Sequence, residues 1–409
     1  MPQQTPKYRG LVGTSYRELS HMVNDPRYGP KGTAAQLIEG LRRKDIRPNE
    51  FAIRPLFEAL VPAGREILQD WSTGGGFAES TRTLLEADTV KSSQFSQITG
   101  QMVYAKTLEA YDNEEFVFTK TIPEVQTPGN LDLEKVAGIS GVGNENEVVG
   151  EGMPYPGAGP VSDYIHLPPV KKRGQKVALT WEAVYSDRTG QLLQRAADVG
   201  FFLGYDKEVR IIDAICDENG GAVTAVQGGH RYHWRDTTYA TYQTSTPWDN
   251  VTTSNALVDW TDIEAAELTM SRITDPNTGL PILITPTHII VTKQLEYTAR
   301  YILSATSLAI HAGGYATSGT LNEMQVSNFI PKYTVLTSRL LETRMATDTD
   351  WYLCNPKAWG YRVAIPLETR QASDNHPDNF DRDIVNQWLC REMGAAFTND
   401  PRLTHESRA

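Results

Sequence analysis

Two short groups of residues have side chains that could bind a metal ion. His230 and His233 place two imidazoles three positions apart, a spacing that could ligate one metal from a helix. The segment from Asp374 to Asp383 is the densest acidic cluster, and its oxygens could serve a calcium ion. However, no third ligand lies near the histidines, and the acidic spacing fits no known calcium loop. Surface or packing histidines and a solvated turn that caps the next helix are simpler explanations, so we predict no metal site.

Motifs of catalysis and cofactor binding are absent from the sequence. It contains no H-E-x-x-H, G-x-S-x-G, Walker A, dinucleotide-binding or EF-hand pattern. The triple glycine at 74–76 has no Gly-Lys-Ser/Thr after it, so a hinge or helix stop is expected there. Cys216, Cys354 and Cys390 are far apart, which favours buried thiols over disulfides or a zinc site. We therefore expect no enzyme and no cofactor.

The composition is that of a soluble globular chain with an uneven charge. Of its 409 residues 40% are hydrophobic, and its net charge is −11. No apolar run could cross a membrane and no signal peptide is recognisable, so synthesis in the cytosol is expected. The acidic balance argues against a protein whose main task is to grip nucleic acid. Residues 1–70, in contrast, hold eleven basic and eight acidic residues and form a mildly basic segment.

The N-terminal third is predicted to be an extended arm followed by helices. Residues 1–34 are rich in glycine, proline and tyrosine, which indicates little helix. Apolar residues then recur at helical spacing at 34–44, 49–70 and 101–111. Phe116 and Phe118 would share one face of a strand at 115–120.

A long projecting finger is predicted in the middle of the chain. The segment 138–169 is dense in glycine and proline and too long for an ordinary tight connection. We expect strands at Tyr164–Leu167 and from Val177 to Trp181 to flank its tip.

A rod-like helix should follow the finger. Asp187 or Thr189 can cap its start, and apolar residues run at helical spacing to Cys216. About 28 residues at 1.5 Å each give a helix of roughly 40 Å.

The remainder is predicted to mix short strands and helices. Strands are expected at 282–291, 333–338, 352–354 and 360–367, and helices at 262–273, 294–304 and 383–393. A basic arm, a finger and a rod do not help a monomer bury its own core. An uncovered β-finger is a liability, so these features favour a protein that interlocks with copies of itself.

The order of these parts resembles the major capsid proteins of tailed bacteriophages. The similar stretches are VGEGMPYP at 149–156, KRGQKV at 172–177, TWEA at 180–183, DRTG at 187–190 and NPKAWGYRV at 355–363. The resemblance implies an α+β fold, the Hong Kong 97-like capsid fold. Its parts would be an N-terminal arm, an extended β-hairpin loop, a peripheral domain with a long spine helix, and an axial domain. These would occupy 1–89 (arm and helices), 90–140 (peripheral, first part), 141–173 (extended loop), 174–224 (peripheral, with spine helix), 225–350 (axial) and 351–409 (peripheral, C-terminal part).

The resemblance also implies a function. Copies of the chain would form hexamers and pentamers of an icosahedral-type shell around double-stranded DNA, assembled in the host cytoplasm as the capsid of the virion. Implied partners are the chain itself, a portal protein, a cement or decoration protein, and DNA bound without sequence specificity. No lysine lies at the finger's tip, so covalent crosslinking of the loop is not expected.

Two groups of site residues follow from this reading. Extended-loop residues expected at a subunit interface are Glu151, Met153, Pro154, Tyr155, Pro156, Lys171, Lys172 and Arg173. Basic residues of the arm that could face DNA are Arg42, Arg43, Lys44 and Arg47. Two alternatives stay open at this point: an encapsulin-like compartment shell, and a β-rich metal-dependent hydrolase or lectin that uses His230, His233 and the cluster from Asp374 to Asp383.

Overall fold

A computed structural model describes most of the chain, which is divided into two compact units. The described residues are 29–44, 47–48, 52–60, 65–66, 68–69, 89–127, 129–140, 148–155, 163–217, 232–245, 247–304, 307–311, 321–325, 333–345, 347–372 and 384–409. The first unit takes in 1–113, 172–205 and 366–392, and the second takes in 114–171, 206–365 and 393–409. Residues 351–409, expected as one peripheral segment, are thus shared between the units. Among the described residues no helix is long and apolar enough to span a membrane.

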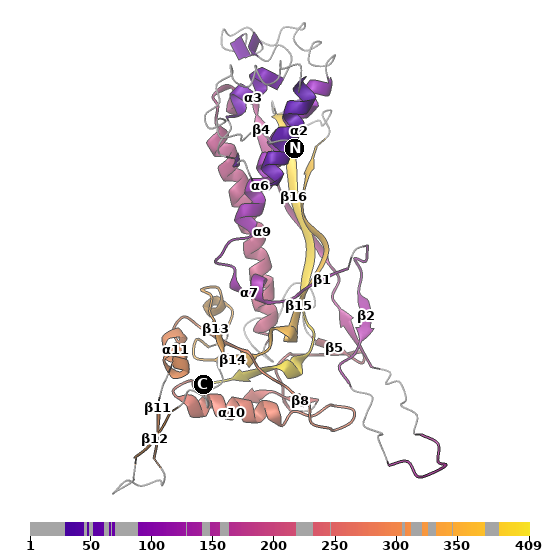
Figure 1. The fold of residues 1–409 in the computed structure, drawn as a ribbon, viewed down its shortest axis with the longest axis vertical. Helices are drawn as coiled ribbons and strands as arrows, with labels where there is room; N and C mark the ends of the chain where they lie inside the picture. Colours follow the sequence, from indigo (N-terminus) through magenta and orange to yellow (C-terminus); the bar gives the residue numbers. More distant parts are fainter. Residues whose placement is uncertain are drawn as a thin grey trace, which may run out of the picture. The chain divides into compact units, whose positions relative to one another are not determined.

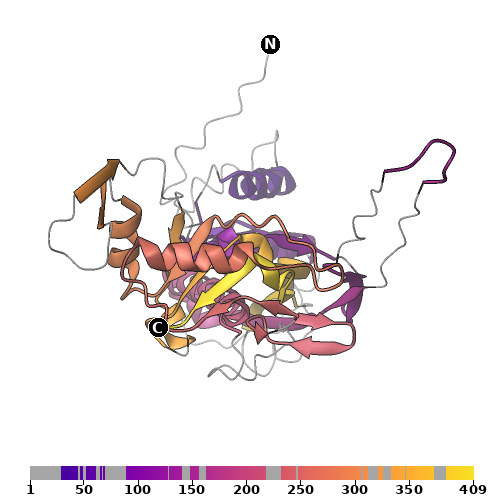
Figure 2. The same cartoon turned by 90° about the horizontal axis from the view of Figure 1, so that it is seen from below.

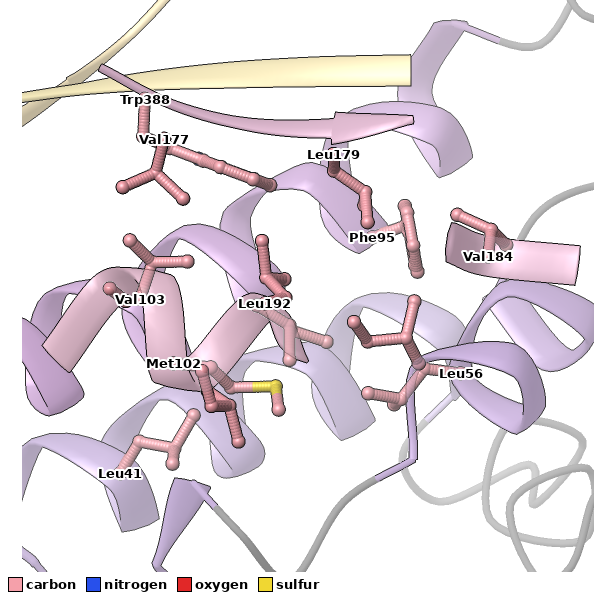
Figure 3. Close-up of a cluster of buried hydrophobic side chains, with 14 of the residues drawn as sticks. Leu41, Leu56, Phe95, Met102, Val103, Val177, Leu179, Val184, Leu192 and Trp388 are labelled. Carbon is pink, nitrogen blue, oxygen red and sulfur yellow. The ribbon is translucent and has the colours of Figure 1, made fainter. Parts of the chain in front are cut away.

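The first unit consists of helices packed on the ends of long strands. Its helices are α2 (Gly29–Arg42), α3 (Ile53–Leu60), α6 (Thr89–Tyr111), α8 (Trp181–Tyr185) and the first part of α9 (Thr189–Ile215). Figure 3 shows the buried side chains that hold them together, with Met102 and Leu192 from two helices beside Val177 and Trp388 from strands. These elements enclose one apolar core, which burial of hydrophobic surface stabilises.

Helix α9 confirms the predicted rod. It spans 27 residues and begins at Thr189, so Thr189 is its first residue and not the residue before it, where an N-cap would lie. The Thr189 hydroxyl accepts the backbone N–H of Ile53 (2.8 Å) and donates to Asp187 (2.8 Å), so the start of α9 is joined to α3. The helix contributes residues to both units.

A four-stranded sheet has the order β1-β15-β16-β4. Its strands are β1 (Glu124–Gln126), β15 (Trp359–Gln371), β16 (Ile384–Thr398) and β4 (Lys171–Thr180), and Figure 1 shows β15 and β16 as long neighbouring ribbons. The helix predicted at 383–393 is wrong, because the described residues of this range, 384–393, belong to β16. Trp388, Cys390 and Glu392 are all buried, with partly buried residues between them. A buried glutamate on the inward face concealed the two-residue period of a strand.

The strand predicted at 115–120 is also wrong. Val117–Thr121 forms the short helix α7. The Glu208 carboxylate accepts the backbone N–H groups of Phe118 (2.9 Å) and Thr119 (2.7 Å), which satisfies donors that the start of a helix leaves without partners. The cause lies about 90 residues away in sequence, so the local pattern could not reveal it.

The second unit contains a five-stranded sheet of order β13-β10-β14-β17-β9. The strands are β13 (Thr334–Leu336), β10 (His288–Val291), β14 (Trp351–Cys354), β17 (Thr404–Ser407) and β9 (Val251–Thr252). Helices α10 (Trp260–Ser271) and α11 (Glu296–Ser304) share one apolar core with residues of this sheet. Other elements of the unit are β7 (Thr244–Ser245), β8 (Trp248–Asp249), β11 (Ser307–His311), β12 (Leu321–Gln325), η3 (Leu341–Thr343), η4 (Pro356–Ala358) and η5 (Pro401–Leu403). The mixture of helices with mainly antiparallel sheets confirms the α+β class.

Candidate subunit interface

A second four-stranded sheet, of order β2-β3-β5-β6, carries the long glycine- and proline-rich excursion. Its strands are β2 (Glu134–Ala137), β3 (Tyr164–Leu167), β5 (Tyr232–Trp234) and β6 (Thr237–Tyr239). Strands β2 and β3 pair antiparallel, with Glu134 opposite Leu167 and Ala137 opposite Tyr164. Of the chain between them, the described part 148–155 is drawn away from β2 in both cartoon views (Figures 1 and 2). We call residues 138–163 the extended loop.

The predicted pair of finger strands needs correction. Tyr164–Leu167 is a strand, as expected, but its partner in the hairpin is β2. Residues 171–180 form β4, which pairs with β16 in the other sheet, and Trp181 begins α8. Strand β2 has an exposed face, with Lys135 and Ala137 beside an exposed Val136, so its sequence lacks the alternation that marks a half-buried strand.

The tip segment exposes apolar side chains. The exposed fractions are 102% for Val148, 67% for Met153 and 86% for Tyr155. A tight turn presents them: the Met153 N–H donates to the Gly150 carbonyl (3.0 Å), and Gly152 has a φ of 80°, which favours glycine. The predicted interface residues Glu151 and Pro154 are exposed beside them, whereas Pro156 lies outside the described residues.

The three basic residues of the same prediction lie elsewhere. Lys171 and Lys172 are exposed and Arg173 is partly buried at the start of β4. They therefore belong to a different sheet from the strands that bear the extended loop.

The four basic residues that were predicted to face DNA, Arg42, Arg43, Lys44 and Arg47, are all exposed. Arg42 ends α2, and Arg43 forms an ion pair with Glu39 (2.7 Å) one turn earlier. Lys44 has a φ of 60° just after the helix, and Arg47 follows.

A buried arginine from β15 fixes the two chain segments that lead into and out of the loop-bearing hairpin. The Arg362 side chain is 0% exposed. Its nitrogens donate to the Thr127 hydroxyl (2.9 Å), the carbonyls of Asn130 (3.1 Å), Asp132 (2.8 Å) and Pro168 (2.9 Å), and the Glu134 carboxylate (3.0 Å). A guanidinium has five donors in a rigid plane and no acceptor, so it suits a site lined by carbonyls.

A second buried arginine, from η5, reaches the start of the loop itself. Arg402 is held by a two-point contact with Asp400 (2.9 Å for both bonds) and lies 3.4 Å from Asp275. Its Nη2 donates to the Ile139 carbonyl (2.7 Å). Burial opposes the charge, but the hydrogen bond and charge of Asp400 raise the pKa of Arg402, which stays positive.

Asp163 closes the other end of the loop. Its backbone carbonyl accepts the Gly138 N–H (3.0 Å) and its Oδ2 accepts the Ser140 N–H (2.9 Å). A Cβ at residue 138 would lie 2.3 Å from this carboxylate, so glycine permits the close approach. Arg235 lies 3.7 Å from Asp163 Oδ1. We call Arg362, Arg402, Asp163 and Arg235 the root cluster, since together they contact both ends of the extended loop or its flanking strands.

The pKa of Tyr232 is affected by charges of the same region. Burial is the main cause that raises the pKa of its phenol, and the negative charges of Asp400 and Asp163 raise it further. The positive charge of Arg402 acts in the opposite direction, so burial is what keeps the Tyr232 phenol neutral beside the root cluster.

Sequence reasoning did not identify the root cluster. One signal was present: Arg362 lies between Tyr361 and Val363 in a run that predicts a strand buried among apolar residues. A charged residue there must find buried partners, although the pattern does not name them.

The proposed metal ligands are not brought together in the described part of the chain. His233 lies in β5, while His230 and the segment from Asp374 to Asp383 fall outside the described residues. Among described residues no group of three or more His, Cys, Asp or Glu side chains could hold a metal. Cys216, Cys354 and Cys390 are buried, and burial raises the pKa of the Cys354 thiol.

Comparison with known proteins gives one family match. The model of a family described as phage capsid protein matches residues 167–403, which is more than half of the chain. No curated protein matches it.

Several solved structures are similar to this chain at low identity and low TM-score. A virus-like particle from Pyrococcus furiosus is 10% identical over 75% of this chain and 98% of its own, with a TM-score of 0.41. Gordonia phage Cozz is 12% identical over 72% and 86%, with a TM-score of 0.40. The capsid of cyanophage P-SCSP1u is 14% identical over 71% and 86%, with a TM-score of 0.39. At these values the family match alone supports an assignment.

Proposed function

Because the chain belongs to the phage capsid protein family, we propose that its copies assemble as hexamers and pentamers of a closed shell around double-stranded DNA. Family membership makes it a major capsid protein, a structural protein of the virion that assembles with itself, and not an enzyme. It contradicts the hydrolase or lectin alternative and favours a phage shell over a cellular compartment.

The observation that supports the proposed assembly is the extended loop. Met153 and Tyr155 are exposed on an isolated subunit, and their burial on a neighbour would remove apolar surface from water. Holding the loop in one orientation would favour this contact, because preorganisation lowers the entropic cost of binding. The root cluster would support such an orientation through partly buried, charged hydrogen bonds at both ends of the loop.

The remaining parts of the proposal follow the family resemblance. The segment 225–350 would be the axial domain around each capsomer centre, and the segments 90–140, 174–224 and 351–409 would form the peripheral domain. The exposed residues Arg42, Arg43, Lys44 and Arg47 would face the DNA, with contacts to phosphate that carry no sequence information. A portal protein and a cement or decoration protein would complete the particle, which would assemble in the host cytoplasm.

The loop contact can be tested by placing charge at its tip. In Met153→Asp/Tyr155→Asp, two carboxylates would have to be buried without partners at the proposed contact, which is strongly unfavourable. We expect the thermal unfolding midpoint of the subunit to stay unchanged, because both side chains are exposed in it. Particle yield, measured by electron microscopy and sedimentation, should fall at least about tenfold, the effect of roughly 1.4 kcal/mol.

The matched control is Met153→Leu/Tyr155→Phe, which keeps the apolar area and should assemble normally. Normal particles from the aspartate variant would show that the loop tip is not an interface. Absence of particles from the unchanged protein would contradict the shell function itself.

A further inference from the structure

Two exposed helix faces in the second unit have complementary chemistry. Helices α10 and α11 bury their inner sides in the same core, through Ile263 and Met270 of α10 and through Ala299 and Ile302 of α11. Their exposed residues therefore turn away from that core. Figure 1 shows α11 beside β13 and α10 along another side of the same sheet.

The outer face of α11 is aromatic and basic. Tyr297 and Tyr301 are each 78% exposed and lie one helical turn apart. Arg300 and Lys293 both pair with Glu296 and both remain more than half exposed. Two cations thus share one carboxylate of the helix. The Glu342 carboxylate accepts the Lys293 backbone N–H (3.1 Å), so the excess positive charge of this face lies at Arg300. Tyrosine and arginine are enriched at the centres of protein interfaces.

The outer face of α10 is apolar and acidic. Val258, just before the helix, is 72% exposed and Leu268 is 49% exposed. Asp259 at the N-cap and Glu264 are exposed beside them. The segment 259–271 holds four acidic residues and no basic residue, so it is negatively charged throughout.

We infer that the α11 face of one subunit packs against the α10 face of the next subunit in the same ring. The occupant is a second copy of this chain, because the two faces match in charge and both offer apolar surface. The faces cannot meet within one subunit, since the shared core lies on the inner side of both helices. Such a contact is head-to-tail: every copy offers one face of each kind, and rotation closes the ring. The inference rests on the proposed function and names the surfaces that would join subunits within a capsomer.

Crosslinking can locate this contact. In particles of Tyr301→Cys/Leu268→Cys, a short bis-maleimide should join α11 of one copy to α10 of the next. Denaturing gels should then show a ladder that ends at five and six chains. The native cysteines are buried and should not react. Each single variant should stay uncrosslinked, because α11 meets α10 and does not meet itself.

Charge reversal gives a second, independent test. Arg300→Glu alone and Glu264→Arg alone should each raise the concentration needed for capsomer assembly about tenfold, as like charges then meet. An equimolar mixture should assemble near the unchanged concentration, since alternating copies restore opposite charges in rings with an even number of subunits. Glu182→Arg on α8, an exposed acid on neither face, is the control and should assemble normally.

The outcomes separate this inference from the proposed function. Particles without a ladder, or a mixture that assembles no better than the single variants, would overturn the pairing and leave the shell function intact. Crosslinked dimers from one single-cysteine variant would show that a helix meets its own copy, so a symmetric contact would replace the inferred pairing of α11 with α10. If double-cysteine chains do not assemble, the charge-reversal mixture decides alone. Failure of the unaltered chain to form rings or shells would instead contradict the proposed function.

Discussion

At the scale of single residues, the loop depends on groups that are buried and charged. Arg362 meets three carbonyls, a hydroxyl and a carboxylate without contact with solvent. Burial of a charge is unfavourable unless its hydrogen bonds are made, so such a residue tolerates little change. Arg402 acts in the same way at Ile139.

Replacement of Arg362 by methionine should destabilise the subunit. The change leaves the carbonyls of Asn130, Asp132 and Pro168 without their donor. The bond to Pro168 is buried and its loss costs about 1–3 kcal/mol, whereas the bonds to Asn130 and Asp132 are partly buried and cost less, because water can replace the donor. Because Glu134 is partly exposed and can turn to water, we expect a total loss of about 2–4 kcal/mol in denaturant unfolding. Arg370→Met on the same strand is the control: Arg370 is exposed, and its loss should change stability by less than about 0.5 kcal/mol. Equal losses of unfolding free energy in the two variants would show that the buried contacts of Arg362 stabilise the subunit no more than those of the exposed Arg370.

At the scale of elements, α6 and α9 approach closely where a glycine allows it. A Cβ at Gly200 would lie 2.1 Å from the Thr107 carbonyl oxygen. The Thr107 hydroxyl, which lies 2.8 Å from the Val103 carbonyl of its own helix, is also 3.2 Å from the Ala196 carbonyl, so a side-chain hydrogen bond links α6 to the backbone of α9. The pairing of these helices is therefore set by backbone contact as well as by apolar side chains.

Gly200→Ala should force α6 and α9 apart. The added methyl group meets backbone, which cannot turn aside, and we expect a loss of about 1–3 kcal/mol in unfolding free energy. The control is Gly190→Ala, because Gly190 lies on the same helix and a Cβ added there would meet open space. That control should be neutral or slightly stabilising, since alanine favours helix by about 1 kcal/mol. A Gly200 variant as stable as the Gly190 variant would contradict the close contact.

Elements whose apolar residues recur with a regular period could be predicted from the sequence. Elements without such a period could not be predicted as well. Helix α9 was predictable because its apolar residues recur over many turns. Helix α7 and strand β16 were not, because Glu208 caps one from far away and Glu392 lies buried on the inner face of the other. Among site residues, Met153 and Tyr155 could be expected at an exposed tip from composition. The root cluster could not, because it joins residues hundreds of positions apart.

At the scale of the whole molecule, stability should depend on pH through buried groups of opposite sign. Burial lowers the pKa of His405 to about 3, so this imidazole, 2.8 Å from the Thr252 hydroxyl, is neutral in the folded subunit. Burial also raises the pKa of Glu208 and of Asp213. Acidification removes stability through the histidine and adds stability through these two carboxyls, because a raised carboxyl pKa means that the folded state takes up the proton first.

The histidine contribution can be isolated by comparison with His405→Gln. Between its ordinary pKa of 6.5 and about 3, the unfolded chain binds a proton that the folded chain does not. From about pH 6 to pH 4 the unchanged subunit should therefore lose about 1.4 kcal/mol per pH unit relative to the variant. Unfolding free energies measured across this range would check it. Parallel pH profiles would mean that His405 is accessible to protons when folded.

The contact between Arg402 and Ile139 has a consequence for the order of events during translation. The two residues are 263 positions apart. At about 5–20 residues per second, the ribosome needs roughly 13–53 s to add the arginine after the isoleucine. A nascent chain thus exposes its apolar loop tip during this interval without the arginine that fixes the start of the loop. Capture by finished copies would be disfavoured in that time, so interlocking is expected to wait until Arg402 has been made.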